Sequence, residues 1–526
     1  MSLRRAARLV ALALAVAAPA AAQSTTVDWL VRGGSIYDGS GAAPLRADLG
    51  IRGDRIVFVG DAVARGVTGE RTIDATGLVV TPGFIDAHTH AGDDLSQAAT
   101  AGVPHILLQG VTTVVLGNDG GGPVDVSAAR ERLAARGVGV NVAFLVGFGT
   151  IRRAVLGMSS REPTRAELDR MRALARQGMT GGAFGLSTGL YYAPQSYAAT
   201  DEVVAVAKAA AESGGYYDTH LRDESSYTIG LLGAVREALE IGRRAGVPVH
   251  LAHIKALGVD VWGQSDSIVA IVTAARRAGQ RVTADQYPYT ASGTSLTASL
   301  LPRWAEVGGR EQMLKRLDDR ELAPKLRSEV ADNLRRRGGP ASFLITSGPR
   351  TGQRLDAIAR ETGAEPIDAA FAMIRQAPTA VASFNMNEKD VERLMRAEFV
   401  VTGSDGSAGH PRRYGAFPRL FREYVSERGV LSFTDAVARS SARTGELIGL
   451  ERRGRLADGW FADVAVIDSA SFADRATYER PTEPAVGVRY LFVNGSLVVD
   501  QGRVAPVRGG RVLSRGSAGG GRRRQP

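Results

Sequence analysis

Histidine and aspartate residues spaced as metal ligands are the part of this sequence best suited to chemistry. His88 and His90 follow a short apolar run, and their i and i+2 spacing on extended backbone points both imidazoles to one side. His220 and His253 each follow another strand-like run, and Asp405 follows the last one. Imidazole nitrogens and carboxylate oxygens are ligands that zinc and similar divalent ions accept. The five residues therefore predict a metal centre, provided that the fold brings them together.

The composition supports this choice of ligands. The chain of 526 residues contains no cysteine, so thiolate ligands and disulfides are excluded. Its hydrophobic fraction of 44% and charged fraction of 23% are ordinary for a globular protein with a large core. The formal net charge of +10 comes from the two ends, because arginines cluster before residue 9 and after residue 502. The near-neutral body between them does not predict a nucleic-acid surface.

Both ends of the chain are expected to lie outside the folded protein. Residues 1–22 combine a basic start, an apolar run from 9 to 17 and small residues at 20–22, which predicts a signal peptide. We therefore expect a periplasmic or secreted protein without a stable membrane anchor, exported by the Sec or the Tat pathway. The basic tail, 503–526, is rich in glycine and arginine and is expected to be solvated and disordered. Binding of this tail to lipid headgroups or nucleic acid is the alternative.

Apolar strands alternate with amphipathic helices between residues 81 and 440, which predicts a parallel sheet. The helix after Thr164 begins with a capping box that ends at Glu167. Eight strands of this kind predict an α/β (β/α)₈ TIM barrel, with functional residues at the carboxyl ends of its strands. After a first strand that ends before His88, they are expected at 111–116, 140–146, 182–186, 216–219, 247–252, 281–286 and 398–402.

The segments on either side of the barrel are predicted to form a second domain. Residues 23–80 and 441–502 contain short strands separated by glycine-rich turns, and neither segment is long enough to bury a core alone. We expect the two segments to pair into one small β-sandwich. Residues 296–337 are charged and helical without a matching strand, so they are predicted to be an insertion in the barrel.

Eight segments resemble the amidohydrolase superfamily and, within it, the D-aminoacylase (N-acyl-D-amino-acid deacylase) group. The histidine pair alone is typical of the superfamily, whereas the whole set, in this order, is typical of the group. The segments are Gly83–His90, Gly110–Val114, Gly185–Leu190, Tyr217–Glu224, Ala252–Lys255, Asp285–Tyr289, Gly403–Gly406 and His410–Arg412.

The resemblance implies a zinc enzyme with one or two ions. His88 and His90 would hold one ion, and His220 and His253 the other. Asp405 would be the general base that takes a proton from the attacking water and returns it to the leaving amine. The resemblance also implies that the insertion, at about 291–345, is a lid over the barrel mouth.

One departure from the family falls on a ligand position. Asp119 stands where the family usually carries a cysteine that bridges the metals. A carboxylate can bridge two cations with its two oxygens, so Asp119 is expected to be a ligand. The alternative is an enzyme with one metal or with lower metal affinity.

Four residues are candidates to bind the carboxylate of the substrate: Lys255, Tyr287, Tyr289 and Arg412. Surface or packing roles are the alternative for each of them. His410 either lines the pocket or is an ordinary loop residue. The resemblance implies an amide hydrolase that removes the acyl group from N-acyl-D-amino acids, which are small-molecule substrates. A cyclic-amide or dipeptide hydrolase, of the dihydroorotase or isoaspartyl-dipeptidase kind, and a non-catalytic barrel are the alternatives. The preferred side chain, the number of metals and the oligomeric state stay open.

Overall fold

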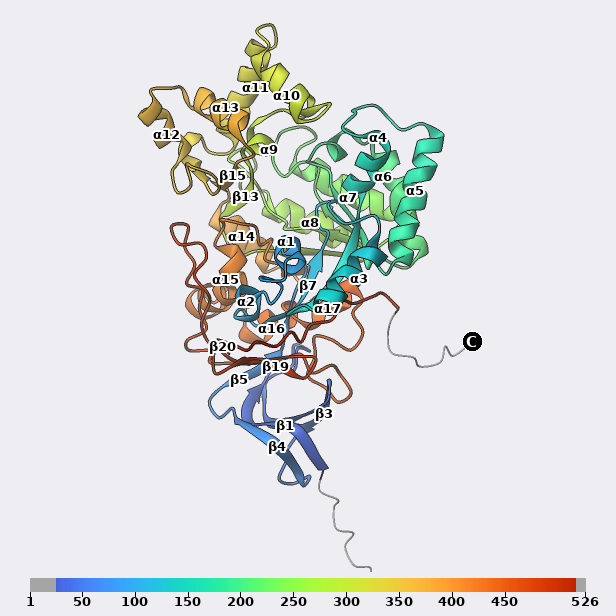
Figure 1. Cartoon of the computed structure of the whole chain (residues 1–526), viewed down its shortest axis with the longest axis vertical. Coiled ribbons are helices and arrows are strands. Elements are labelled where there is room, and N and C mark those ends of the chain that lie inside the picture. Colours follow the sequence, from blue (N-terminus) through green and yellow to red (C-terminus); the bar gives the residue numbers. More distant parts are fainter. Residues whose placement is uncertain (1–24, 517–526) are drawn as a thin grey trace, which may run out of the picture.

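The computed structural model describes residues 25–516. It shows a barrel with a sheet of terminal strands at one end and a mostly helical insertion at the other (Figure 1). The predicted signal peptide, 1–22, lies outside the described residues. Among the described residues, no helix has the length and apolar character needed to cross a membrane.

Eight parallel strands form the barrel, which confirms the predicted fold. They are hydrogen-bonded in the order β16-β12-β11-β10-β9-β8-β7-β6. Every residue of β7 and β8 is buried, because a strand inside a barrel is covered on both faces. The strands are β6 (Phe84–Asp86), β7 (Val111–Leu116), β8 (Asn141–Gly147), β9 (Gly185–Gly189), β10 (Tyr216–His220), β11 (Val249–Leu251), β12 (Val282–Gln286) and β16 (Val400–Thr402).

The first and last strands of the barrel meet just beyond their carboxyl ends. Thr89 and Gly406 form an isolated parallel bridge, and the backbone N–H of Asp405 donates to the carbonyl oxygen of His88 at 2.9 Å. The seam of the barrel therefore places the segment that carries the histidine pair beside the segment that carries Asp405.

Amphipathic helices surround the strands. Helix α5 begins at the predicted capping box, in which the backbone N–H of Glu167 donates to Thr164 Oγ1 and the N–H of Thr164 donates to Glu167 Oε2. The helices between the strands include α3 (Val126–Arg136), α4 (Phe148–Leu156), α5 (Arg165–Thr180), α6 (Thr200–Glu212), α7 (Leu231–Ala245), α8 (Ser265–Arg277) and α14 (Glu388–Met395).

The two ends of the chain pair with each other, as predicted, and the strands of the expected β-sandwich are hydrogen-bonded into one nine-stranded sheet. Its order is β20-β19-β18-β17-β5-β1-β2-β3, with β4 beside β1, and the antiparallel pair of β17 and β5 joins the two ends. Val31 and Val80 from the first end share a core with Val464 and Phe492 from the second. The strands are β1 (Thr25–Ile36), β2 (Leu45–Arg52), β3 (Arg55–Gly60), β4 (Val67–Asp74), β5 (Val79–Pro82), β17 (Val464–Ile467), β18 (Val488–Val493), β19 (Ser496–Asp500) and β20 (Arg503–Val504).

The insertion is longer than predicted, and it extends to residue 384. It contains a three-stranded antiparallel sheet in the order β13-β15-β14 and a hydrophobic core of its own. Its second half was missed because α12 and α13 are amphipathic in the same way as barrel helices. The elements are β13 (Ala291–Ser295), α9 (Leu296–Leu300), α10 (Arg310–Asp318), α11 (Ala323–Arg336), β14 (Phe343–Ile345), α12 (Leu355–Thr362), α13 (Pro366–Gln376) and β15 (Ala380–Phe384).

The prediction of a disordered tail from residue 503 is wrong for residues 503–516. Strand β20 pairs with β19, and the N–H of Leu513 donates to the carbonyl of Val142 in barrel strand β8 at 2.8 Å. The glycines that suggested flexibility serve close packing instead, because a Cβ on Gly510 would lie 2.7 Å from the backbone nitrogen of Val140. Residues 517–526, the rest of the predicted tail, lie outside the described residues.

Candidate active site

The structure gathers every residue predicted to bind metal or to act as the base. All of them lie at the carboxyl ends of barrel strands, where barrel enzymes carry their functional groups. They are His88 and His90 after β6, Asp119 after β7, His220 at the end of β10, His253 after β11 and Asp405 after β16.

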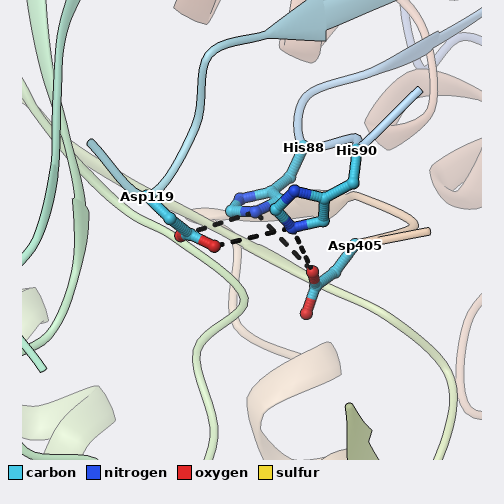
Figure 2. Close-up of side chains that lie close together, drawn as sticks. All are labelled: His88, His90, Asp119 and Asp405. Atoms are coloured by element: carbon cyan, nitrogen blue, oxygen red, sulfur yellow. Dashed lines mark hydrogen bonds and ion pairs between the residues drawn. The ribbon is translucent and has the colours of Figure 1, made fainter. Parts of the chain in front are cut away.

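The first group of ligand atoms comes from His88, His90, Asp119 and Asp405 (Figure 2). Nε2 of His90 lies 3.5 Å from Oδ2 of Asp119 and 3.1 Å from Oδ1 of Asp405. Nε2 of His88 lies 3.6 Å from Oδ1 of Asp119. One atom from each residue lies within 4.8 Å of the others, which is compatible with a single shared cation.

A second group shares Asp119 with the first. Oδ1 of Asp119 lies 3.4 Å from Nε2 of His253 and 3.7 Å from Nδ1 of His220. These two imidazole nitrogens lie 2.9 Å apart. Asp119 thus faces both histidine pairs, the position that a bridging ligand needs.

The donor set fits divalent metal ions. Both ring nitrogens of His88 and Oδ1 of Asp119 are buried without a hydrogen-bond partner, although buried polar atoms normally have one. Neutral imidazoles and carboxylates, with no thiolate present, suit zinc. A cation between the two histidine pairs would satisfy Nε2 of His88 and Oδ1 of Asp119, which lie 3.6 Å apart.

The backbone is strained at three of the site residues. Asp119, His253 and Asp405 have φ angles of 56°, 34° and 45°, in the left-handed region that few residues other than glycine adopt. Each residue follows a barrel strand, so the chain turns sharply and directs the side chain into the site. Such strain persists only where the surrounding structure fixes it, and it is concentrated at functional sites.

Arg412 fixes the ionisation of Asp405. Its Nη2 lies 2.8 Å from Oδ2 of Asp405, and its side chain is fully buried. Burial alone would raise the pKa of Asp405, but the charge of Arg412 beside it holds that pKa well below its usual value. Asp405 is therefore a carboxylate at neutral pH, as a general base must be.

Glu224 is a site residue that the sequence analysis did not single out. Its Oε1 lies 2.5 Å from Nζ of Lys255 and 3.2 Å from Nδ1 of His253. Contacts of this kind orient a ligand imidazole so that its other nitrogen faces the metal. The available signal was the position of Glu224, four residues after His220 in one of the segments that resemble the family.

A cavity of about 320 Å³ opens above these ligands. Of the predicted substrate-binding residues, Lys255 and Tyr287 line it, as does His410. Tyr289 and Arg412 are not among the lining residues, because Tyr289 packs between Arg419 and His410 while Arg412 pairs with Asp405.

Two further sets of lining residues were not predicted. Tyr191 and Tyr192 follow β9, and their rings lie 5.7 and 4.8 Å from the ring of His220. Arg337 follows α11 of the insertion. It ends a run of three arginines, and the sequence pattern does not show which of them is buried.

Comparisons with known proteins agree with this geometry. A model of the amidohydrolase family matches residues 71–499. The chain is 34% identical to a D-aminoacylase of Alcaligenes xylosoxydans xylosoxydans over 522 residues, which cover 94% of this chain and 99% of that protein. It is 33% identical to an N-acyl-D-glutamate deacylase of the same organism, over 93% and 97% of the two chains.

Solved structures give the same result. A crystal structure of a D-aminoacylase has a TM-score of 0.79 at 34% identity and covers 93% of this chain and 100% of its own. An N-acyl-D-glutamate deacylase from Bordetella bronchiseptica, complexed with zinc and a phosphonate inhibitor, has a TM-score of 0.79 at 33% identity with the same coverage. Another D-aminoacylase structure describes a binuclear metal centre. Because the family model and these relatives cover most of the sequence, the chain belongs to the amidohydrolase family, in the group that includes the D-aminoacylases.

Proposed function

We propose that this protein is a metal-dependent amide hydrolase that removes the acyl group from N-acyl-D-amino acids. The observation that carries the proposal is the ionised Asp405 beside a two-part ligand set at the base of a cavity. One or two zinc ions would be held by His88, His90, Asp119, His220 and His253. The metal supplies a Lewis acid that activates water and polarises the amide carbonyl.

The chain's own residues perform the proton transfer. Asp405 takes a proton from the attacking water and returns it to the nitrogen of the leaving amine, so that the amide C–N bond breaks. Arg412 keeps Asp405 ionised and oriented through their contact at 2.8 Å. Lys255 and Tyr287 line the cavity and bind the α-carboxylate of the substrate.

The insertion supplies the outer wall of the cavity. Thr294 of β13, Arg337 and Val381 of β15 all line it. A wall of this kind excludes water from the reaction and restricts which substrates enter. We propose that the insertion sets the preference among N-acyl-D-amino acids. Overall sequence identity does not indicate this preference, because the relatives at 33–34% identity are a D-aminoacylase, an N-acyl-D-glutamate deacylase and an N-acyl-D-aspartate deacylase.

The test compares the two enantiomers of one substrate. Protein loaded with zinc, its metal content measured, is expected to hydrolyse N-acetyl-D-methionine and to leave N-acetyl-L-methionine unchanged. Removal of the metal by a chelator should abolish this turnover, and added zinc should restore it. Full zinc occupancy without turnover of any N-acyl-D-amino acid would disprove the proposed function.

We also propose that the protein is exported to the periplasm or secreted. The support is the basic, apolar and small-residue pattern of residues 1–22. Fractionation of cells that express the full chain is expected to recover a form shortened at its amino end outside the cytoplasm. Recovery of the full-length chain in the cytoplasm alone would contradict this.

A further inference from the structure

The cavity above the metal ligands contains a buried positive charge without a counter-charge. Arg337 lines the cavity, and only 2% of its surface is exposed. Within residues 25–516, no carboxylate lies within ion-pair distance of its guanidinium. The other cations at or near the cavity are paired: Lys255 with Glu224, Arg412 with Asp405, and Arg303 with Glu306.

The contacts of Arg337 are neutral and incomplete. Its Nη2 donates to the hydroxyl of Tyr191 at 3.3 Å. With the amide of Asn385 oriented so that its oxygen faces the guanidinium, Nη1 donates to that oxygen at 3.3 Å. Nε is buried without a partner. The guanidinium thus retains donors for an additional acceptor.

Such an arrangement is unfavourable unless a ligand completes it. Arginine stays charged in proteins, so burial cannot be relieved by loss of its proton. A buried charge without a partner opposes folding, and a carboxylate would compensate it. The planar guanidinium also matches the two oxygens of a carboxylate, which makes a carboxylate the favoured ligand.

Arg337 lies close enough to the metal ligands to contact a substrate. The ring of Tyr191, whose hydroxyl accepts from Arg337, stacks on the ring of His220 with centroids 5.7 Å apart. One tyrosine side chain therefore separates the guanidinium from a predicted metal ligand. When the scissile amide lies at the metal site, a short side chain or acyl group of the substrate would reach Arg337.

We propose that Arg337 binds a second carboxylate of the substrate, so that the enzyme prefers N-acyl-D-amino acids with two carboxylates. The inference rests on the proposed function and specifies its substrate class. The α-carboxylate is assigned to Lys255 and Tyr287, which leaves Arg337 for a different one. That second carboxylate belongs either to an acidic side chain or to the far end of a dicarboxylic acyl group.

The test uses two matched pairs of substrates that differ in one carboxylate. N-acetyl-D-glutamate is compared with N-acetyl-D-glutamine, and N-succinyl-D-methionine with its monoamide, N-succinamoyl-D-methionine. In the wild type, kcat/KM should be about ten- to a hundredfold higher for the acidic member of one pair, as expected for a hydrogen bond to a charged group. The pair that shows the preference identifies where the second carboxylate lies.

The variant Arg337→Gln should lose this preference, mainly through a higher KM for the acidic substrate of the pair. Arg337→Lys should restore part of the preference, because it restores the charge without the planar geometry. Arg335→Gln is the matched control: Arg335 lies in the last turn of α11, two residues before Arg337, is about half exposed and pairs with Asp260, and its loss should change neither pair.

Two results would overturn the inference. In the first, the wild type hydrolyses acidic and neutral members equally, a result that does not depend on whether any variant folds. In the second, a folded, zinc-loaded Arg337→Gln protein loses activity equally on all four substrates, which would place Arg337 on the shared α-carboxylate. Turnover without acidic preference refutes this inference alone, whereas no turnover of any of these substrates by zinc-loaded wild type refutes the proposed function.

Discussion

At the scale of single residues, Asp119 has the most unusual role in the site. It stands where the resemblance to the family implies a cysteine, and one of its oxygens lies within 3.7 Å of nitrogens from His88, His220 and His253. Burial would raise its pKa, but its side-chain contacts with His88 and His253 hold that pKa well below its usual value. Asp119 is therefore a carboxylate in the folded protein and does not depend on the redox state of its surroundings, as a thiolate would.

We predict that Asp119→Ala lowers the metal content of the purified protein, because both ligand groups lose their shared member. Metal affinity should fall by more than the roughly ten- to hundredfold that is typical when a residue outside the ligand set is changed. Asp119→Cys, which places a thiolate at the same position, should retain metal. The measurement is metal per chain by elemental analysis after dialysis against metal-free buffer. Full metal content in the alanine variant would remove Asp119 from the ligand set.

We predict that Asp405→Asn lowers kcat by about a hundred- to ten-thousandfold, the usual contribution of a general base. The amide cannot accept the proton of the attacking water, although its shape is unchanged. Turnover of N-acetyl-D-methionine is measured at constant zinc content. Asp368→Asn is the control, because Asp368 lies on the surface and pairs with Arg327. Near-normal turnover in Asp405→Asn would assign the base to another residue.

At this scale, sequence reasoning predicted the four histidines and Asp405 because each lies at the end of a predicted barrel strand, and Asp119 because it stands at a ligand position of the family. It placed Tyr289 and Arg412 in contact with substrate, whereas the structure buries them behind the cavity wall. It missed Glu224 although the spacing from His220 was an available signal, and it missed Arg337 for a physical reason. Which charged side chain turns inward depends on packing between distant segments, and no local pattern records that packing.

At the scale of elements, strand β6 is positioned by a close approach to β7. A Cβ on Gly83, the residue before β6, would lie 2.8 Å from Cβ of Thr112 and closer still to the other side-chain atoms of that buried residue. Glycine at this position lets the first strand lie against its neighbour. The strand then ends at Asp86, two residues before His88.

We predict that Gly83→Ala lowers the free energy of unfolding by about 1–3 kcal/mol, the usual effect of overpacking a buried contact. Metal content should fall with it, because His88 and His90 follow the displaced strand. The free energy of unfolding is measured by urea denaturation, and the metal content by elemental analysis. Gly102→Ala is the matched control, since a Cβ there meets no atom within 4 Å. Equal stability of the two variants would show that β6 adjusts without cost.

The boundaries of elements were predicted less well than their type. The insertion was expected to end near residue 345, yet β14, at residues 343–345, pairs with β15 inside the insertion. The periodicity of α12 and α13 reports a buried face and does not report which core buries it. Only the spatial arrangement distinguishes the core of the insertion from that of the barrel.

At the scale of the whole molecule, a buried polar network joins the terminal sheet to the barrel. Asn141, at the start of β8, accepts from Nδ2 of Asn494 at 2.7 Å and from the backbone N–H of Arg511 at 3.1 Å. Nη2 of Arg453 donates to Oδ1 of Asn494 at 2.7 Å, and Arg453 also pairs with Asp463. The network fixes the orientation of the sheet against the amino end of a barrel strand.

We predict that Asn141→Ala lowers the free energy of unfolding by about 1–3 kcal/mol, the cost of leaving buried donors without acceptors. The free energy is measured by urea denaturation, with Asp500→Ala, an exposed residue of the same sheet, as the control. Activity of the remaining folded protein should be unchanged, because the network lies away from the metal ligands. A stability equal to that of the control would mean that water replaces the lost acceptor.

The pairing of the two ends has a consequence for synthesis on the ribosome. Strand β5, at residues 79–82, has β17, at residues 464–467, as a neighbour, and barrel strand β8 bonds to residues 511–513. One edge of β5 and the amino-terminal part of β8 are therefore covered only after nearly the whole chain has been made. Pairings between such distant segments close slowly, and uncovered strand edges associate with other chains. The nascent protein is accordingly expected to depend on chaperones until its last strands are made.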